Sequence, residues 1–539
     1  MTIQFKLPIE YVTYNRISND ITDNIDSKSI YLKTFNPITE QGKEMITNMY
    51  QYTTTDENYL VDTQNLITLK DNININVSKI KLFSNEFKNI QNIQKFNSHF
   101  QYIDSSYLNF LNNNENVLQL LGLYNFTSPI INLITPLVVL IIPFFILKLK
   151  KIKITFQTYK EYLFESLFKK FNISNISNTS MRTKLYLCIT ILFYIIGIYQ
   201  NIMSSIKFYK NNKYVNSFFT KCNEYFSYLN DQQSNFIKQV KEIKTYKLFV
   251  DDLSINNTNI IDIKSQLDSI RTYSIGKKMK LFYKFKYNTT FIDACNYSLS
   301  FIGYLDNVNG FINNKSLNTC VFHNKTIFKN FYMPIETTNI IKNSCNLKRN
   351  YIISGPNAAG KTTIIKSLLL NTILSQQIGK GYYDEACILP CHHFHCYLNI
   401  PDTNNRDSLF QAEARQCKNI IDSIQKHSKE QHFVIFDELY SGTNHEQAVK
   451  SAYSYLKYLG EFKNVSFILT THFYDLCNKI KKNISNKLIM NISMKTKNVN
   501  NENMYLYKLQ KGISNTKSGF DILKKMNYPD KIMNTLENS

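Results

Sequence analysis

The stretch that decides the fold of the C-terminal part is YIISGPNAAGKTTIIKSLLL, residues 351–370. Its first four residues predict a short strand, and the run after residue 362 favours a helix. Between them, GPNAAGKT at 355–362 satisfies the pattern GxxxxGK[ST]. Small residues in such a loop let backbone N–H groups surround phosphate groups at the N-terminus of the helix. The stretch therefore predicts a phosphate-binding loop in an α/β domain.

This loop predicts ATP and Mg²⁺ as ligands. The Lys361 ammonium would meet the β and γ oxygens of the nucleotide, and the Thr362 hydroxyl would bind Mg²⁺. The candidate ATP-binding residues are Gly355, Pro356, Asn357, Ala358, Ala359, Gly360, Lys361, Thr362 and Thr363.

Two further stretches place ionisable side chains at the ends of predicted strands. In HFVIFDELYSG (432–442), a buried strand would deliver Asp437 and Glu438 at its C-terminal end, where ligands bind in open α/β sheets. Asp437 would hold Mg²⁺ through water, and Glu438 would polarise the attacking water as a catalytic residue. VSFILTTHFYDL (465–476) predicts another buried strand that ends at His472, which would contact the γ-phosphate or the water. A structural role for His472 is the alternative, which the order of the three elements disfavours.

Together these motifs resemble those of the MutS mismatch-repair ATPases, members of the ABC-type ATPase superfamily. GPNAAGKTT is similar to that family's GPNMGGKST, DELYSGTNHEQAVKSA to its DEIGRGTSTYDGLALA, and FILTTHFYDL to its FATHYFEL. NRDSLFQAEARQCKNII (405–421) is similar to its signature stretch GRSTFMVEMTETANIL. The segment 506–533 resembles the one that closes the family's ATPase domain, whose Ser-x-Gly and Pro correspond to Ser518, Gly519 and Pro529.

The resemblance covers about residues 310–539 and implies roles for individual residues. It implies that Asn357, Gly360, Lys361 and Thr362 bind phosphate and Mg²⁺, that Asp437 supports the metal, that Glu438 activates water and that His472 senses the γ-phosphate. Ser408 would lie in the signature element that completes the site of an opposing subunit, which implies a homodimer closing on ATP. DNA is the partner that the family implies.

Some positions depart from the family pattern. Ala358 and Ala359 replace Met and Gly, and both are small enough to keep the loop. Asp407 and Ser408 replace Ser-Thr, and residues 444–446 replace the usual loop after the acidic pair, so details of the dimer contact are open. Residues 1–120 show no convincing counterpart of the family's mismatch-reading domain with its Phe-x-Glu wedge.

Two apolar segments upstream predict a membrane anchor. Residues 129–147 and 185–206 carry no charge, and a bilayer core of about 30 Å needs roughly 20 apolar residues in a helix. A pair of buried helices in a soluble bundle is the alternative. Pro129, Pro136 and Pro143 predict a kinked or re-entrant first segment.

Charge leaves the membrane topology open. The loop 148–184 is rich in Lys and Arg, so the positive-inside rule places it in the cytosol. Two complete spans would then put both termini and the nucleotide site outside, where ATP is scarce. We therefore expect a multi-pass or hairpin anchor with the ATPase domain facing the cytosol. FQTYKEYLFESLFKKF (156–171) predicts a helix on the membrane surface or, alternatively, a core-facing helix, with one apolar face formed by Phe156, Tyr159, Leu163, Phe164, Leu167 and Phe171.

Composition bounds the possible partners. The 539 residues carry a formal net charge of +22, which suits nucleic acid or lipid headgroups and does not choose between them. The ten Cys form no CxxC pair, and the N-terminal stretch MTIQFKLPIEYVTYNR does not resemble a signal peptide. We therefore expect reduced thiols, and we do not expect a simple secreted protein. CHHFHC (391–396) and Cys387 offer Zn²⁺ ligands. Alternate side chains of a strand face opposite ways and no second ligand pair stands nearby, which disfavours a metal site.

The expected fold is an α/β P-loop ATPase domain with a mostly parallel sheet, preceded by a mainly α-helical region that contains a transmembrane hairpin. The predicted domains are an N-terminal helical region (1–124), a membrane anchor (125–206), a lever-like helical region (207–310) and a MutS-type ATPase domain (311–539). The expected function is a membrane-anchored ATPase that hydrolyses ATP at a dimer interface, coupled to DNA. The alternatives are an ABC-type ATPase coupled to transport or to a protein or lipid partner, and a nucleotide-locked scaffold.

Overall fold

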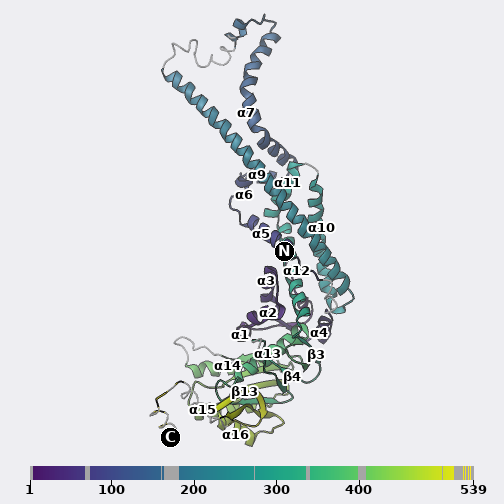
Figure 1. The fold of residues 1–539 in the computed structure, drawn as a ribbon, viewed down its shortest axis with the longest axis vertical. Helices are drawn as coiled ribbons and strands as arrows, with labels where there is room; N and C mark the ends of the chain where they lie inside the picture. The colour runs from purple at the N-terminus through teal and green to yellow at the C-terminus, as the bar shows by residue number, and fades with distance from the viewer. Residues whose placement is uncertain are drawn as a thin grey trace. The chain divides into compact units, whose positions relative to one another are not determined.

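The computed structural model describes residues 4–66, 73–159, 161–162, 181–271, 274–335, 340–398, 408–499 and 502–514, with residues 526, 528, 529, 532 and 535. The chain divides into two compact units, whose elements are labelled in Figure 1. The helical unit comprises 76–231 and 256–296. The α/β unit comprises 4–75, 232–255 and 297–539.

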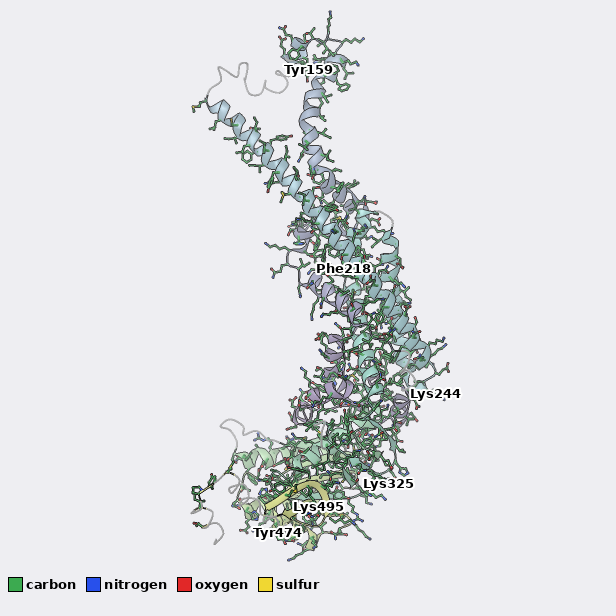
Figure 2. All side chains as sticks on the ribbon, viewed as in Figure 1. Tyr159, Phe218, Lys244, Lys325, Tyr474 and Lys495 are labelled. Atoms are coloured by element: carbon green, nitrogen blue, oxygen red, sulfur yellow. The ribbon has the colours of Figure 1, made fainter. Side chains whose placement is uncertain are left out.

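The helical unit is held together by aromatic side chains from several helices. Phe218, labelled in Figure 2, has its ring centroid 5.7 Å from that of Phe282 and 5.1 Å from that of Phe285, and Tyr225 stacks on Phe83 at 4.1 Å. These rings recur at helical spacing, so each helix turns one apolar face inward. The helices that lie wholly or partly in this unit are α5 (Val77–Asn92), α6 (Phe96–Phe100), η3 (Asn109–Asn113), α7 (Glu115–Leu149), α9 (Met181–Val240), α10 (Lys247–Asp268), η7 (Ser269–Arg271), α11 (Ile275–Tyr287) and α12 (Thr289–Asn313).

Helix α7 corrects one expectation about the first apolar segment. It continues through Pro129, Pro136 and Pro143 without interruption, so the re-entrant form is not found. The prolines are spaced by seven residues, close to two helical turns, so the three missing N–H groups lie on one side of the helix. The hydrogen bonds along the other side stay intact, which lets the helix continue.

Helices α7 and α9 expose apolar surface. The stretches Glu115–Thr135 and Cys188–Val240 are long and apolar enough to cross a membrane, by length and composition. In the most apolar part of the first stretch 17% of the residues are buried, and in that of the second stretch none are. The two helices touch where Tyr194 Oη donates to the Asn132 carbonyl at 2.8 Å. Of the predicted surface helix at 156–171, residues 160 and 163–171 lie outside the described part of the chain.

The α/β unit contains the mostly parallel sheet that the sequence predicts. Among the described residues this sheet has six strands in the order β13-β12-β6-β11-β10-β9, and only the β12–β13 pair is antiparallel. The strands are β6 (Asn350–Ser354), β9 (His393–Tyr397), β10 (His432–Asp437), β11 (Val465–Thr471), β12 (Ile489–Val499) and β13 (Glu502–Lys511). A second sheet, which the sequence analysis does not anticipate, has the order β5-β4-β8-β3-β7. Its strands are β3 (Asn318–Phe322), β4 (Ile327–Phe331), β5 (Asn343–Asn346), β7 (Lys380–Gly381) and β8 (Glu385–Ile388).

Helices cover both faces of the parallel sheet. Helices α14 (Leu409–Lys426), α15 (His445–Leu459) and α16 (Tyr474–Asn483) share one core with Val434 and Phe436 of β10. Helix α13 (Lys361–Ile378) packs on β10 and β11 from the other face. Burial on both faces explains why β10 is a continuous apolar run rather than an alternating one.

The N-terminal segment packs onto α13. Gln376 and Gln377 on this helix donate to the carbonyls of Thr54 (3.1 Å) and Tyr52 (2.7 Å) on β2. Residues 4–75 thus group with the C-terminal part and support the helix that begins at the GxxxxGK[ST] loop. The elements concerned are η1 (Pro8–Tyr11), β1 (Tyr14–Arg16), α1 (Asn19–Asn24), α2 (Ser27–Phe35), α3 (Glu40–Met49), β2 (Tyr52–Thr54), α4 (Glu57–Gln64) and, later in the chain, η6 (Lys244–Tyr246).

Candidate phosphate-binding site

The loop between β6 and α13 has the backbone that its sequence demands. Ala358 and Gly360 adopt positive φ angles of 63° and 86°, and Gly360 is the N-cap of α13. A Cβ atom on Gly360 would lie 3.0 Å from Tyr507 Cδ1, so a larger residue is disfavoured by both conformation and space. The loop therefore curls ahead of a helix N-terminus, where backbone N–H groups lack intrahelical partners.

The Lys361 ammonium lies inside this curl. Its side chain is 5% exposed, and Nζ donates to the carbonyls of Gly355 (2.9 Å) and Pro356 (3.1 Å). Burial lowers the pKa of Lys361, against the opposing attraction of Glu438 and Asp437. A buried cation held mainly by backbone carbonyls is one that a polyanion would stabilise.

Asp437 ends β10 between two hydroxyl groups. Thr362 Oγ1 donates to its Oδ2 at 2.8 Å, and the hydroxyl of Thr470 donates to its Oδ1. Thr470 is the residue of β11 that stands in register with Asp437, which the sequence analysis does not identify. A carboxylate beside a hydroxyl offers the oxygen ligands that Mg²⁺ prefers.

Glu438 leaves the strand in the left-handed backbone region, with φ 55°. A non-glycine residue there is strained, and such strain gathers at functional sites. Glu438 Oε1 lies 3.1 Å from His472 Nδ1 and 3.9 Å from Lys361 Nζ. The hydrogen bond with His472 holds the pKa of Glu438 below its usual value, despite partial burial. The carboxylate is therefore ionised at neutral pH and can accept a hydrogen bond from water.

A buried carboxylate connects helix α14 to the loop that follows Glu438. Glu413, 2% exposed, accepts hydrogen bonds from the Ser441 N–H (3.0 Å), the Ser441 hydroxyl (2.8 Å) and the Gly442 N–H (3.1 Å). Glu413 is not among the residues predicted from the sequence, although a lone Glu on the apolar face of α14 is a usable signal. At the start of α14, Ser408 is the N-cap and forms a capping box with Gln411.

Several of these groups line one cavity of about 940 Å³. Of the predicted site residues, those in its lining are Asn357, Ala358, Gly360, Lys361, Thr362, Thr363, Asp437 and Glu438. His472 reaches the site through Glu438, and Ser408 has a helix-capping role within this one chain. The lining also includes the largely apolar side chains of Tyr332, Ile335, Ile340 and Ile341. Asp407, Ser518 and Gly519 lie outside the described residues.

Comparison with known proteins agrees with the resemblance seen in the motifs. Residues 351–539 match the family model of MutS domain V. The chain is 29% identical over 208 residues to the DNA mismatch repair protein MSH3 of Candida albicans, which covers 34% of this chain and 19% of that protein. It is 23% identical over 314 residues to the DNA mismatch repair protein MutS of Borreliella afzelii, which covers 56% of this chain and 34% of that protein. The chain thus spans about a fifth to a third of these relatives. Over residues 351–539 the chain is therefore similar to MutS domain V, and the relatives that it resembles are MutS and MSH proteins.

Proposed function

We propose that the chain is a Mg²⁺-dependent ATPase whose site is the cavity at the start of α13. The observation that carries the proposal is that Lys361, the Thr362–Asp437 pair and Glu438 line this one cavity. The polar residues of the lining suit a triphosphate, and the apolar residues with Tyr332 suit a base. Phosphate release from ATP by the full-length chain tests the proposal directly.

Each residue has a stated task in this proposal. Lys361 and the loop N–H groups bind the phosphates, and Thr362 and Asp437 hold Mg²⁺, which supplies positive charge to the phosphate oxygens. Glu438 orients a water for attack on the γ-phosphate and accepts its proton. His472, 3.1 Å from Glu438, fixes that carboxylate and would respond to the γ-phosphate. Ser408 would complete the site of a second copy in an ATP-bound homodimer.

We propose DNA as the macromolecular partner, because the similar proteins are named as DNA mismatch repair proteins and the net charge is +22. The full-length chain in nanodiscs should bind duplex DNA in a manner that ATP changes. Affinity should fall at least about tenfold as salt rises from about 50 to 200 mM, because each neutralised phosphate releases counterions. Matched, mismatched and branched duplexes are compared by fluorescence anisotropy.

Empty nanodiscs control for binding to lipid. Lys361→Met controls for nucleotide, because it should keep DNA binding and lose the response to ATP. Intact ATPase activity without DNA binding beyond the controls would contradict the DNA partner and favour the alternative of a protein or lipid partner.

We also propose that α7 and α9 anchor the chain in a membrane. Residues Leu192, Phe193 and Ile195 of α9 are 56%, 68% and 56% exposed, and apolar surface of this kind needs a cover. Two continuous helices would put both termini on one side, and we place the ATPase part in the cytosol. The loop at 150–180 then lies opposite, against the positive-inside rule. Protease protection of a tag in that loop tests this topology.

The chain is expected to stay in the membrane pellet after carbonate extraction. Replacing Leu192, Phe193 and Ile195 together with Lys should release it, because each charge at the centre of a span costs about 2.5–3.5 kcal/mol. The control replaces the exposed Tyr107, Leu108 and Phe110 with Lys and should remain in the pellet. Release of the wild-type chain would instead support a soluble helical bundle.

A further inference from the structure

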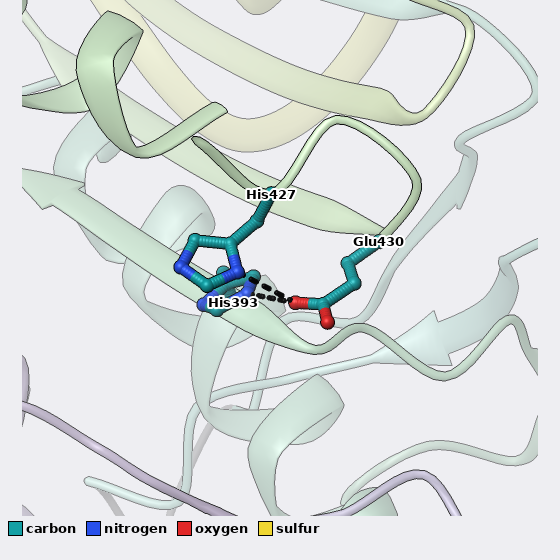
Figure 3. Close-up of side chains that lie close together, drawn as sticks. All are labelled: His393, His427 and Glu430. Carbon is teal, nitrogen blue, oxygen red and sulfur yellow. Dashed lines mark hydrogen bonds and ion pairs between the residues drawn. The ribbon is translucent and has the colours of Figure 1, made fainter. Parts of the chain in front are cut away.

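A cluster of metal-ligating side chains lies in the α/β unit at the end of the sheet where β9 and β10 begin. His393 Nε2 is 2.5 Å from Glu430 Oε2, and His427 Nδ1 is 3.3 Å from the same oxygen. One ligand atom from each of the three residues lies within 4.8 Å of the others. Figure 3 shows both imidazole rings facing this carboxylate oxygen.

Local structure explains why residues so distant in sequence meet. His393 is the first residue of β9 and stands in register with His432, the first residue of β10. His427 follows the last residue of α14, and Glu430 lies three residues on, in the short turn that leads into β10. The Gln431 carbonyl in this turn accepts from the N–H groups of His392 (2.8 Å) and His393 (3.1 Å). These hydrogen bonds hold the turn next to the beginning of β9.

We propose that His393, His427 and Glu430 form a binding site for Zn²⁺ or a similar borderline divalent metal ion. Two imidazole nitrogens and one carboxylate make up a three-ligand set that leaves a fourth position for water. Imidazole does not suit Mg²⁺ or Ca²⁺, which prefer oxygen ligands. In a zinc site the ligand atoms lie about 3.3 Å apart, given bonds of about 2.0–2.2 Å. Binding would therefore move Glu430 away from His393 Nε2 and bring the two imidazole nitrogens, which lie within 4.8 Å of one another, closer together. The partly exposed side chains of His393 (24%), His427 (35%) and Glu430 (42%) leave room for these shifts.

Two further histidines support the ligands. His432 Nε2 lies 3.1 Å from the His427 carbonyl, and His432 Nδ1 lies 3.1 Å from His395 Nε2. The hydrogen bond to the His427 carbonyl holds the backbone that carries this ligand. His432 is thus a positioning residue and not a ligand.

A metal ion here would join the C-terminal end of α14 to strand β9. The same helix carries Glu413, which binds the loop after Glu438, and has Ser408 as its N-cap. Zinc would therefore stabilise the placement of the helix that adjoins the proposed ATPase site. The site itself stands on its own geometry and does not depend on ATP hydrolysis.

The test uses the full-length chain, stripped of metal with a chelator and titrated with Zn²⁺ by calorimetry, with Mg²⁺ as the comparison ion. We expect one Zn²⁺ per chain and a rise in melting temperature, because the ion binds only the folded chain. His427→Ala removes a ligand and should weaken zinc binding by more than the about ten- to hundredfold that loss of an outer-shell partner costs. His432→Phe breaks a hydrogen bond to the backbone of His427 and not to its ring, so it should weaken binding by less than that. Co²⁺ substitution should give absorption bands without a thiolate charge-transfer band.

The controls separate this site from other ligands. His445 pairs with the single carboxylate of Asp475 at 3.0 Å, so His445→Ala removes a matched His–carboxylate pair and should keep zinc binding. Cys387→Ser should keep it too. Circular dichroism confirms that each variant is folded. Zinc binding that is absent in the wild type, unchanged in His427→Ala or lost in Cys387→Ser would overturn the proposal.

Discussion

Glu438→Gln is expected to reduce ATP turnover by at least about a hundredfold, the lower end of what a general base contributes, while ATP binding persists. The amide keeps the size of the side chain but cannot accept the proton of the attacking water. It also leaves Lys361 with its carbonyl partners, because the Nζ–Oε1 distance of 3.9 Å is too long for a hydrogen bond. Phosphate release and nucleotide binding are measured separately on the full-length chain.

The same variant tests the dimer. Slow turnover should trap the ATP-bound form, so mass measurement with ATP is expected to find a dimer, and adding Ser408→Arg should return it to a monomer. Glu461→Gln, at an exposed position in the same unit, is the control and should leave turnover unchanged. Turnover that survives in Glu438→Gln would contradict the proposed base, and a monomer with every nucleotide would contradict the shared site.

The sequence predicts the parts of the site that depend on local pattern. The loop at 355–362 requires small residues and a glycine at positive φ, and the sequence motif GxxxxGK[ST] reports these requirements directly. Likewise, β10 and β11 are buried on both faces and so appear as apolar runs, of which the first ends at Asp437 and the second is followed by His472. Parallel pairing then brings the ends of the strands to one edge, which is why the predicted residues meet.

The rest depends on contacts between segments far apart in the chain. Thr470 could be found only from its register with Asp437, and Glu413 only from the loop that it binds. Gln376 and Gln377 are unremarkable in a helix until β2 is placed beside them. Single-sequence patterns carry no information on such pairings, because periodicity reports burial and not the identity of the neighbour.

Histidines illustrate the same limit. The CHHFHC stretch draws attention to cysteines, yet Cys391 and Cys396 are buried and are not part of the cluster around Glu430. The partners of His393 stand more than thirty residues away, in the turn between α14 and β10. The side chains that meet at this cluster are therefore not close together in the sequence, and a short-spacing motif does not reveal them.

Lys361→Met is expected to weaken ATP binding by at least about a hundredfold. Loss of two charge-assisted hydrogen bonds at about 1.5–3 kcal/mol each removes at least about 3 kcal/mol, or a factor of about a hundred in affinity. Without nucleotide the fold should be little affected. The variant loses the hydrogen bonds to the Gly355 and Pro356 carbonyls, which lowers the stability of the fold. It also no longer buries a charged group, which raises that stability, and the cost of burying this charge is what lowers the pKa of Lys361. The two effects oppose each other.

Thermal unfolding with and without Mg·ATP separates these two effects. At an ATP concentration about a hundred times the wild-type Kd, the wild type gains about 2.7 kcal/mol of stability, whereas a hundredfold weaker variant gains about 0.4 kcal/mol. Lys366→Met, a half-buried lysine on the same helix that is not in the cavity lining, is the matched control and should respond to ATP like the wild type. An undiminished response to ATP in Lys361→Met would mean that the nucleotide binds elsewhere, because no other described lysine lines this cavity.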